Sequence, residues 1–255
     1  MNPHCRQLVS DEFRDCVQRT LVRLQSEPTS MPFHEALLSR EAVFWSRFER
    51  SFSTSFGQRV IERISAYIAQ YSGAQNVTTQ KQTNVTLDVS RFSAIENNIH
   101  AARSNAIGYS PDWNAEVNYI NNLPLTGTQQ IHRVISDLYF ERDGRANYIS
   151  IKTVKPNIDQ TAEAKRDLLK IKLADSSANV YFGLYYNPFG DRRDLYRWTP
   201  PMRIFNFHTD PCVLIGRDYW DTLGGEGTYN TVLQIARSVS QELQELVRQY
   251  GVDRL

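Results

Sequence analysis

Residues 131–152 read Ile131-His-Arg-Val-Ile-Ser-Asp137-Leu-Tyr-Phe-Glu-Arg-Asp143-Gly144-Arg-Ala-Asn-Tyr148-Ile-Ser-Ile-Lys152. Two short apolar runs flank the Asp-Gly dipeptide, and this arrangement is a strong signal for a β-hairpin. The first run carries a carboxylate, and the second ends in a lysine. At the open end of a sheet, these two groups are suited to holding a divalent metal ion and a water molecule beside a phosphodiester.

Asp137 and Lys152 each have an ordinary explanation when taken alone. An aspartate in a strand most often lies on the solvent-exposed face of an edge strand, and Lys152 could be a solvated strand end. Strand alternation puts Ser150 and Lys152 on one face, and Ile149 and Ile151 on the other. Their pairing favours a functional role, since a tight hairpin brings both to one end of the sheet. The sequence does not determine whether they share a face, because a bulge would change the register.

The segment after the hairpin, Lys152-Thr-Val-Lys155-Pro156-Asn157, predicts a connection from a strand into a helix. Lys155 precedes a proline and is therefore favoured to be extended. Asn157 or Asp159 can cap the following helix. Lysines and an asparagine at a helix N-terminus favour anion binding, although a plain connecting loop explains the segment equally well.

Glu163 lies in the first turns of the predicted helix, eleven residues after the lysine of the hairpin. Gln160 and Asp167 are its neighbours along the helix, and Lys165 and Arg166 are close in sequence. A solvated helix face with charge pairs between successive turns would also explain this pattern.

Bulk composition indicates a globular protein. The chain has 255 residues, 41% of them hydrophobic, and a net charge of +1, so charge alone neither requires nor excludes nucleic acid. Cys5, Cys16 and Cys212 are widely spaced and show no zinc-binding pattern, which predicts packing roles in a reducing compartment. The first residues contain no apolar stretch and no run approaches 18 apolar residues, so we expect neither a signal peptide nor a membrane span. We therefore expect a cytoplasmic protein.

Hydrophobic periodicity predicts a mostly helical first half and a second half that mixes strands and helices. Residues 72–86 are polar and are interpreted as a surface loop, or as a weak strand near 85–89. The other predicted helices are 11–26, 33–48, 56–71, 91–106, 114–121, 159–173 and 229–250, and the predicted strands are 131–141, 147–154, 179–186 and 212–216. This order predicts an α/β fold with a mixed central β-sheet flanked by helices. We expect one domain over 1–255, in which a helical region, 1–55, precedes a core, 56–255, with a helical insertion at about 91–125.

The hairpin and its flanking helices resemble the PD-(D/E)xK nuclease core. Within it, Ser150-Ile-Lys-Thr-Val-Lys-Pro-Asn-Ile-Asp-Gln160 and Ala164-Lys-Arg-Asp-Leu-Leu169 resemble type II restriction endonucleases of the TdeIII kind. Tyr185-Tyr-Asn-Pro-Phe-Gly190 and Val213-Leu-Ile-Gly-Arg-Asp-Tyr-Trp-Asp-Thr-Leu-Gly-Gly225 are similar to the same family. The resemblance covers the chain from about residue 56 to the C-terminal helix. The Lys-Thr-x-Lys-Pro-Asn motif is fairly specific for this family, whereas the Asp…Lys pattern alone is weak evidence for it.

Ser150 departs from the general nuclease motif, which has an acidic residue two positions before the lysine. The resemblance includes a Ser-x-Lys variant in which a carboxylate comes from the next helix. Glu163 is the candidate for that carboxylate, and Asp159 and Asp167 are the alternatives. Glu62, on the predicted helix before the sheet, matches a position where this fold often adds an acidic residue.

The resemblance implies Mg²⁺-dependent hydrolysis of phosphodiester bonds. Mg²⁺ prefers oxygen ligands, and we expect Asp137, Glu163 and the backbone carbonyl of Ile151 to bind it. Lys152 is expected to orient or deprotonate the attacking water and to stabilise the charge that develops on phosphorus. Glu62 would support these ligands or bind a second metal ion.

Double-stranded DNA is the implied partner. The candidates for DNA contact are Lys155, Asn157, Gln160, Arg142, Arg145, Arg192, Arg193 and Arg197. The resemblance suggests a short GC-rich palindrome, which implies a homodimer, and a paired DNA methyltransferase. The N-terminal helices could form the dimer interface or belong to the core. The alternatives are another nuclease of this fold, an inactive DNA-binding relative and an unrelated α/β domain.

Overall fold

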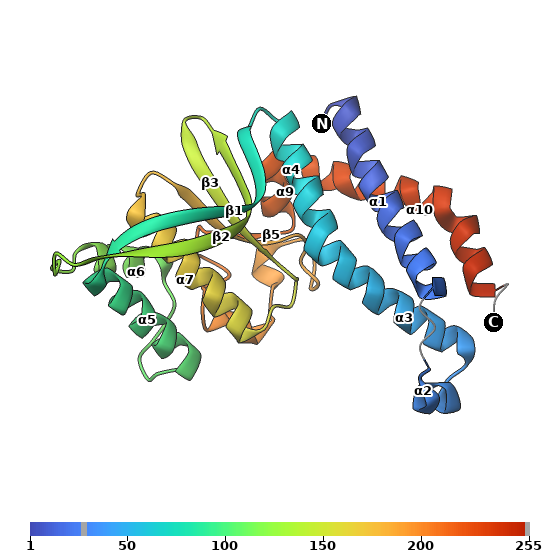
Figure 1. The fold of residues 1–255 in the computed structure, drawn as a ribbon, viewed down its shortest axis with the longest axis horizontal. Coiled ribbons are helices and arrows are strands. Elements are labelled where there is room, and N and C mark those ends of the chain that lie inside the picture. Colours follow the sequence, from blue (N-terminus) through green and yellow to red (C-terminus); the bar gives the residue numbers. More distant parts are fainter. Residues whose placement is uncertain (27–29, 253–255) are drawn as a thin grey trace.

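The predicted hairpin lies within a five-stranded sheet of strand order β1-β2-β3-β4-β5 (Figure 1). This computed structural model describes residues 1–26 and 30–252. The strands are β1 (Gln75–Asp88), β2 (Gln129–Arg142), β3 (Arg145–Lys152), β4 (Asn179–Leu184) and β5 (Val213–Ile215). The first three strands pair antiparallel, and β3, β4 and β5 pair parallel. The prediction of a mixed sheet is thus confirmed.

The turn between β2 and β3 follows from its two residues. Asp143 and Gly144 both have positive φ, at 51° and 69°. A two-residue hairpin turn with positive φ at both positions matches the twist of the strands, and aspartate and glycine tolerate this conformation. Pairing runs from the turn only as far as Leu138 and Ile149. Beyond this pair the two strands separate, which leaves a fork at residue 137.

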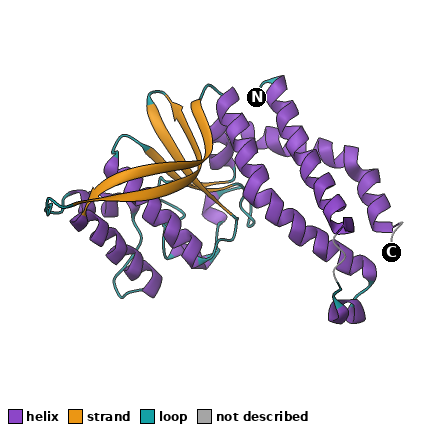
Figure 2. Cartoon of the chain, in the orientation of Figure 1, coloured by secondary structure: helices purple, strands orange, loops and turns teal. Residues whose placement is uncertain are grey.

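Helices cover both faces of the sheet (Figure 2). One face is buried under α5, α6 and α7, and its core includes Val180, Phe182 and Leu184 of β4. The other face packs against α4 and α9, and the core on this side includes Ile149 and Ile151 of β3 together with side chains of α1 and α10. The apolar run of β4 is therefore buried on both sides, as its sequence predicts.

Most of the predicted helices are present, but α1 begins eight residues before the predicted start at residue 11, and α8 and α9 were not predicted. The helix bounds are α1 (Pro3–Ser26), α2 (Pro32–Leu37), α3 (Arg40–Ser55), α4 (Ile61–Tyr71), α5 (Val89–Ser104), α6 (Trp113–Asn121), α7 (Ile158–Ala174), α8 (Thr199–Met202), α9 (Arg217–Gly224) and α10 (Thr228–Val252), with a π-helical turn (Phe56–Val60) and a 3-10 turn (Arg193–Leu195). The helix predicted over 33–48 is wrong in one respect, because the structure divides this region into α2 and α3. Ser39 causes the break, since its side chain caps α3 by accepting the N–H of Ala42 at 3.2 Å. None of the described helices is long and apolar enough to span a membrane.

Strand β1 is the largest difference from the predicted elements. The segment expected to be a surface loop, or a weak strand near 85–89, forms a 14-residue strand that pairs with β2 along nearly its whole length. It is an edge strand, and only its last part, with Val85 and Leu87, enters the core. An edge strand needs little apolar surface, so its polar sequence carried no alternating hydrophobic signal.

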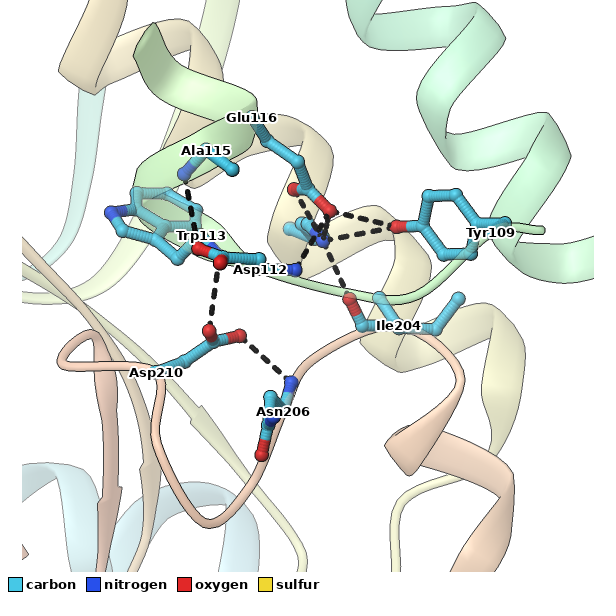
Figure 3. A network of polar contacts seen from close by, with 9 residues as sticks. Tyr109, Asp112, Trp113, Ala115, Glu116, Ile204, Asn206 and Asp210 are labelled. Carbon is cyan, nitrogen blue, oxygen red and sulfur yellow. Dashed lines mark hydrogen bonds and ion pairs between the residues drawn. The ribbon is translucent and has the colours of Figure 1, made fainter. Parts of the chain in front are cut away.

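A buried polar network joins α6 and α7 to the segment after α8 (Figure 3). Lys165 is fully buried, pairs with Glu116 at 2.5 Å and donates to the carbonyl of Ile204 at 2.6 Å. Tyr109 also donates to Glu116, at 2.8 Å, and burial followed by the charge of Glu116 raises the tyrosine pKa. Lys165, which the sequence analysis named only as a neighbour of Glu163, is therefore not on a solvated helix face. Buried charges require such partners, so the network helps to fix α7 to α6 and to the segment after α8.

The three cysteines are free thiols and are buried, which confirms that they pack in the core. Cys5 and Cys16 lie on α1 in the cluster with α4 and α10, and Cys212 lies in the other cluster. Desolvation by burial raises the pKa of Cys16 to about 11. A thiol held protonated in this way is a poor nucleophile, so a packing role fits its surroundings.

Candidate active site

Asp137 lies at the fork where β2 and β3 separate. Its Oδ2 atom accepts the backbone N–H of Ile151 at 2.7 Å, an N–H that the separated strand β2 no longer pairs. The same oxygen lies 3.3 Å from Lys152 Nζ and 3.5 Å from the Ser150 hydroxyl. The Asp137 and Lys152 side chains are 18% and 25% exposed, so both remain accessible to solvent. The structure therefore brings together the carboxylate and the lysine that the sequence singled out.

Glu62 approaches this pair from the first turn of α4, which lies beside β1 in Figure 1. A glutamine of β1 links it to the site, because Gln80 Nε2 donates to Glu62 Oε2 at 3.0 Å and to Asp137 Oδ1 at 3.2 Å. Burial raises the pKa of Glu62, and the charge of Asp137 adds to the rise; the hydrogen bond from Gln80 and the charge of Lys152 oppose it. Glu62 is thus a half-buried acid, and a nearby positive charge stabilises its ionised form.

Gln80 was missed by the sequence analysis. Its segment has no apolar alternation, so it was interpreted as a loop and its side chains were not considered. Only the register of β1 against β2 shows the connection. Thr79 pairs with Leu138 and Lys81 with Ser136, which places Gln80 opposite Asp137.

The oxygen atoms of Asp137 and Glu62 could hold a hard divalent cation. Within the described residues, no group of three or more His, Cys, Asp or Glu side chains is close enough to form a metal site. Two carboxylates nevertheless fit Mg²⁺, which commonly binds one or two carboxylates and retains several waters. The donor set at the fork is therefore consistent with Mg²⁺ and too small for a cage built only from protein.

The sequence-based candidates on α7 lie apart from this cluster. Glu163 is exposed, and within residues 1–26 and 30–252 no hydrogen bond or ion pair joins it to Asp137 or Lys152. Its two alternatives have other partners: Asp159 pairs with Arg103, and Asp167 pairs with Lys170 at 3.0 Å. The carboxylate that joins the site through hydrogen bonds is instead Glu62.

Several DNA-contact candidates are engaged within the protein. Asn157 and Gln160 form a reciprocal capping box at the start of α7, with the Gln160 N–H donating to Asn157 Oδ1 at 2.8 Å. This confirms the predicted cap. Lys155 lies over the rings of Phe189 and Trp198, at 5.6 and 5.5 Å from their centroids. These contacts fix the loop that follows β3.

The arginine candidates fall into three groups. Arg193 donates to the carbonyls of Phe207 and Asp210, at 2.6 and 2.5 Å, which is a structural role. Arg192 forms an exposed ion pair with Asp194, and Arg197 lies over the ring of Phe189. Arg145 is exposed at the hairpin turn, so it remains a candidate for contacting DNA.

Arg142 has a structural role that the sequence did not reveal. Its guanidinium donates to the carbonyls of Thr222 and Leu223 in α9, at 2.8 and 2.7 Å, and to that of Ala69 in α4 at 3.4 Å. It thus satisfies the carbonyls of Thr222 and Leu223 near the end of α9, where helix carbonyls lack intrahelical partners. The Ala69 carbonyl already accepts the N–H groups of Ser72 and Ala74, so its bond to Arg142 is an additional one. Its assignment as a DNA contact is not favoured by this geometry.

Arg142→Ala is expected to lower the free energy of unfolding by about 2 kcal/mol, because it leaves partly buried carbonyls unsatisfied. Arg145→Ala is the matched control, with a change within about 0.5 kcal/mol expected for an exposed site. Urea denaturation measures both effects. Loss of DNA affinity with unchanged stability in Arg142→Ala would instead support the assignment made from sequence.

Comparisons with known proteins agree with this site. A family model described as "Type II restriction endonuclease, HinfI" matches residues 1–240. The type II restriction enzyme HgiEI of Herpetosiphon aurantiacus is 31% identical over 235 residues, covering 89% of this chain and 83% of the relative. HgiBI of the same organism is 29% identical over 264 residues, covering 94% of each. HgiCII is 28% identical over 233 residues, covering 89% and 84%.

An acid–lysine cluster at one end of a mixed sheet, in a chain with these relatives, defines a type II site-specific deoxyribonuclease. The chain belongs to the HinfI family of type II restriction endonucleases. This confirms the restriction endonuclease predicted from the sequence. The narrower resemblance to the TdeIII kind is not supported by the comparisons, and the Ser-x-Lys variant remains a prediction.

Proposed function

We propose that this enzyme hydrolyses phosphodiester bonds of double-stranded DNA in a Mg²⁺-dependent reaction at a short GC-rich palindrome. The observation that carries the chemistry is the contact of Asp137 with Lys152 at the fork, with Glu62 linked through Gln80. A two-fold palindrome implies a homodimer. A paired methyltransferase would protect host DNA in the cytoplasm, where we expect the enzyme to act.

The proposed metal ligands are Asp137, Glu62 and the backbone carbonyl of Ile151, and Glu163 is a further candidate from the sequence. A bound Mg²⁺ would stabilise the attacking and leaving oxygens of the phosphodiester. Asp137 is held for this role by the N–H of Ile151. This hydrogen bond fixes one carboxylate oxygen and leaves the other, Oδ1, facing Gln80.

Lys152 orients the attacking water or accepts its proton, and its positive charge stabilises the negative charge that develops at phosphorus. The ammonium group lies 3.3 Å from Asp137 Oδ2, so it acts beside the proposed metal ligands rather than at a distance from them. Because the lysine ends β3, its position is fixed by the parallel pairing of Lys152 with Leu184. A rigid strand end suits a group that must be placed within a few tenths of an ångström.

The dimer interface could use the N-terminal helices only in part. The buried side chains of α1, including Val9, Phe13 and Leu21, already belong to the protomer. Exposed apolar side chains are concentrated at α2, where Phe33 is 81% and Leu37 is 82% exposed. We therefore describe α1 as part of the protomer core and not as a dimer interface.

Digestion of unmethylated plasmid DNA in Mg²⁺ tests the proposal. Discrete fragments are expected, and their ends would give the recognition sequence and the cut position. Random or structure-dependent nicking would support another nuclease of this fold. Specific binding without cutting would support an inactive relative, and a folded protein that leaves several unmethylated DNAs uncut would contradict the proposed reaction.

A further inference from the structure

Gln80 lies between the two carboxylates of the fork. Its Nε2 atom is within hydrogen-bond distance of Glu62 on α4 and of Asp137 on β2, at 3.0 and 3.2 Å. We infer that Gln80 is a positioning residue that holds these carboxylates at the separation at which they share a divalent cation. The inference rests on the proposed metal dependence.

The backbone at Gln80 is strained in a way that points to a specific role. Its φ is 53°, although it lies inside β1. The other described non-glycine residues with positive φ are Asn76, Asn105 and Asp143, types that tolerate this region. Glutamine has no such preference, and strained positions of this kind cluster at functional sites. The site thus retains a strained residue whose side chain bridges two acids.

The chemistry of the amide suits this task. Two nearby carboxylates repel each other, and those of Glu62 and Asp137 both lie within hydrogen-bond distance of the same amide nitrogen. The amide nitrogen of glutamine carries two N–H groups, so it can donate one to each acid without adding charge. A lysine would neutralise the negative charge that attracts a cation. The glutamine keeps the acids together and leaves their charge available.

The Gln80→Gly variant removes the amide that contacts the two carboxylates and is expected to leave the fold stable, so it tests the positioning role separately from folding. Glycine adopts φ 53° without strain, so the melting temperature of the metal-free protein is expected to stay the same or rise. The dissociation constant for Ca²⁺, obtained from the rise in melting temperature with added Ca²⁺, is expected to increase about tenfold, as for the loss of a hydrogen bond to a charged group. The Mg²⁺ concentration for half-maximal cleavage should rise similarly, with near-normal cleavage at saturating Mg²⁺.

Gln82→Gly is the matched control, because Gln82 is an exposed glutamine two residues along the same strand. It should leave both metal measurements unchanged. An unchanged or lower Ca²⁺ dissociation constant in Gln80→Gly would overturn the inference, and a lower value would mean that the amide obstructs the cation. A wild-type protein that neither binds Ca²⁺ nor needs Mg²⁺ for cleavage would instead overturn the proposed metal dependence itself.

Discussion

Lys152→Ala is expected to reduce the rate of DNA cleavage by about 10³-fold, within the range for removal of a group that transfers a proton in the transition state. The lysine contributes its charge at the fork, 3.3 Å from Asp137 Oδ2, and has no role in the core. The free energy of unfolding should therefore change little. Single-turnover cleavage at saturating DNA and Mg²⁺ measures the effect.

Specific DNA binding should survive in the Lys152→Ala variant and can be measured in Ca²⁺ by fluorescence anisotropy. Lys172→Ala is the control, because Lys172 donates to the carbonyls of Ser176 and Ala178 beyond the end of α7. That change should affect stability but not the cleavage rate. If Lys152→Ala cleaves within tenfold of the wild type, the lysine does not act at the reacting phosphate.

The part of the site that could be predicted lies within one local hairpin. Asp143 and Gly144 determine the turn, and the turn brings Asp137, in the middle of β2, close to Lys152 at the end of β3. Local sequence contains this information because a two-residue turn fixes the register. The prediction did not need any distant part of the chain.

The rest of the site depends on contacts between segments far apart in sequence. Glu62 was a candidate only through the resemblance, and Gln80 was not a candidate. Both meet Asp137 only after β1 pairs with β2, and the polar sequence of β1 gave no more than a weak strand signal near 85–89. Arginines pose a similar difficulty. Arg142 and Arg193 resemble DNA-binding residues by type, but each donates to carbonyls that come close only in the folded protein. Residue type indicates what a side chain can bond, and the fold decides which partner it meets.

Ser150 explains why the source of the second acid matters. It occupies the motif position where an acidic residue is usual, and it is only 9% exposed beside Asp137. A carboxylate there would be nearly buried, and burying a charge without a partner is costly. The serine hydroxyl is instead 3.5 Å from Asp137 Oδ2 and adds no charge. The proposed metal site therefore takes its second carboxylate from another element.

Glu62→Gln is expected to lower the cleavage rate at low Mg²⁺ by at least about 10²-fold, whereas Glu163→Gln should lower it by less than about threefold. Removing one of two carboxylate ligands lowers the affinity for a cation that the protein binds through few contacts. The geometry favours Glu62, which is linked to Asp137 through Gln80, over Glu163, which is exposed on α7. Cleavage rates measured across a Mg²⁺ titration compare the two variants.

Glutamine preserves the shape of each glutamate and removes only its charge, so the comparison isolates metal binding from packing. Asp167→Asn completes the set, because Asp167 is the other acidic alternative on α7 and pairs with Lys170 in the structure. If Glu163→Gln alone abolishes cleavage, α7 supplies the second acid during the reaction, as the resemblance to the Ser-x-Lys variant implies. If Asp167→Asn alone does so, both assignments are wrong. If only Glu62→Gln loses cleavage, then Glu62 on α4 supplies the acid that is absent at position 150.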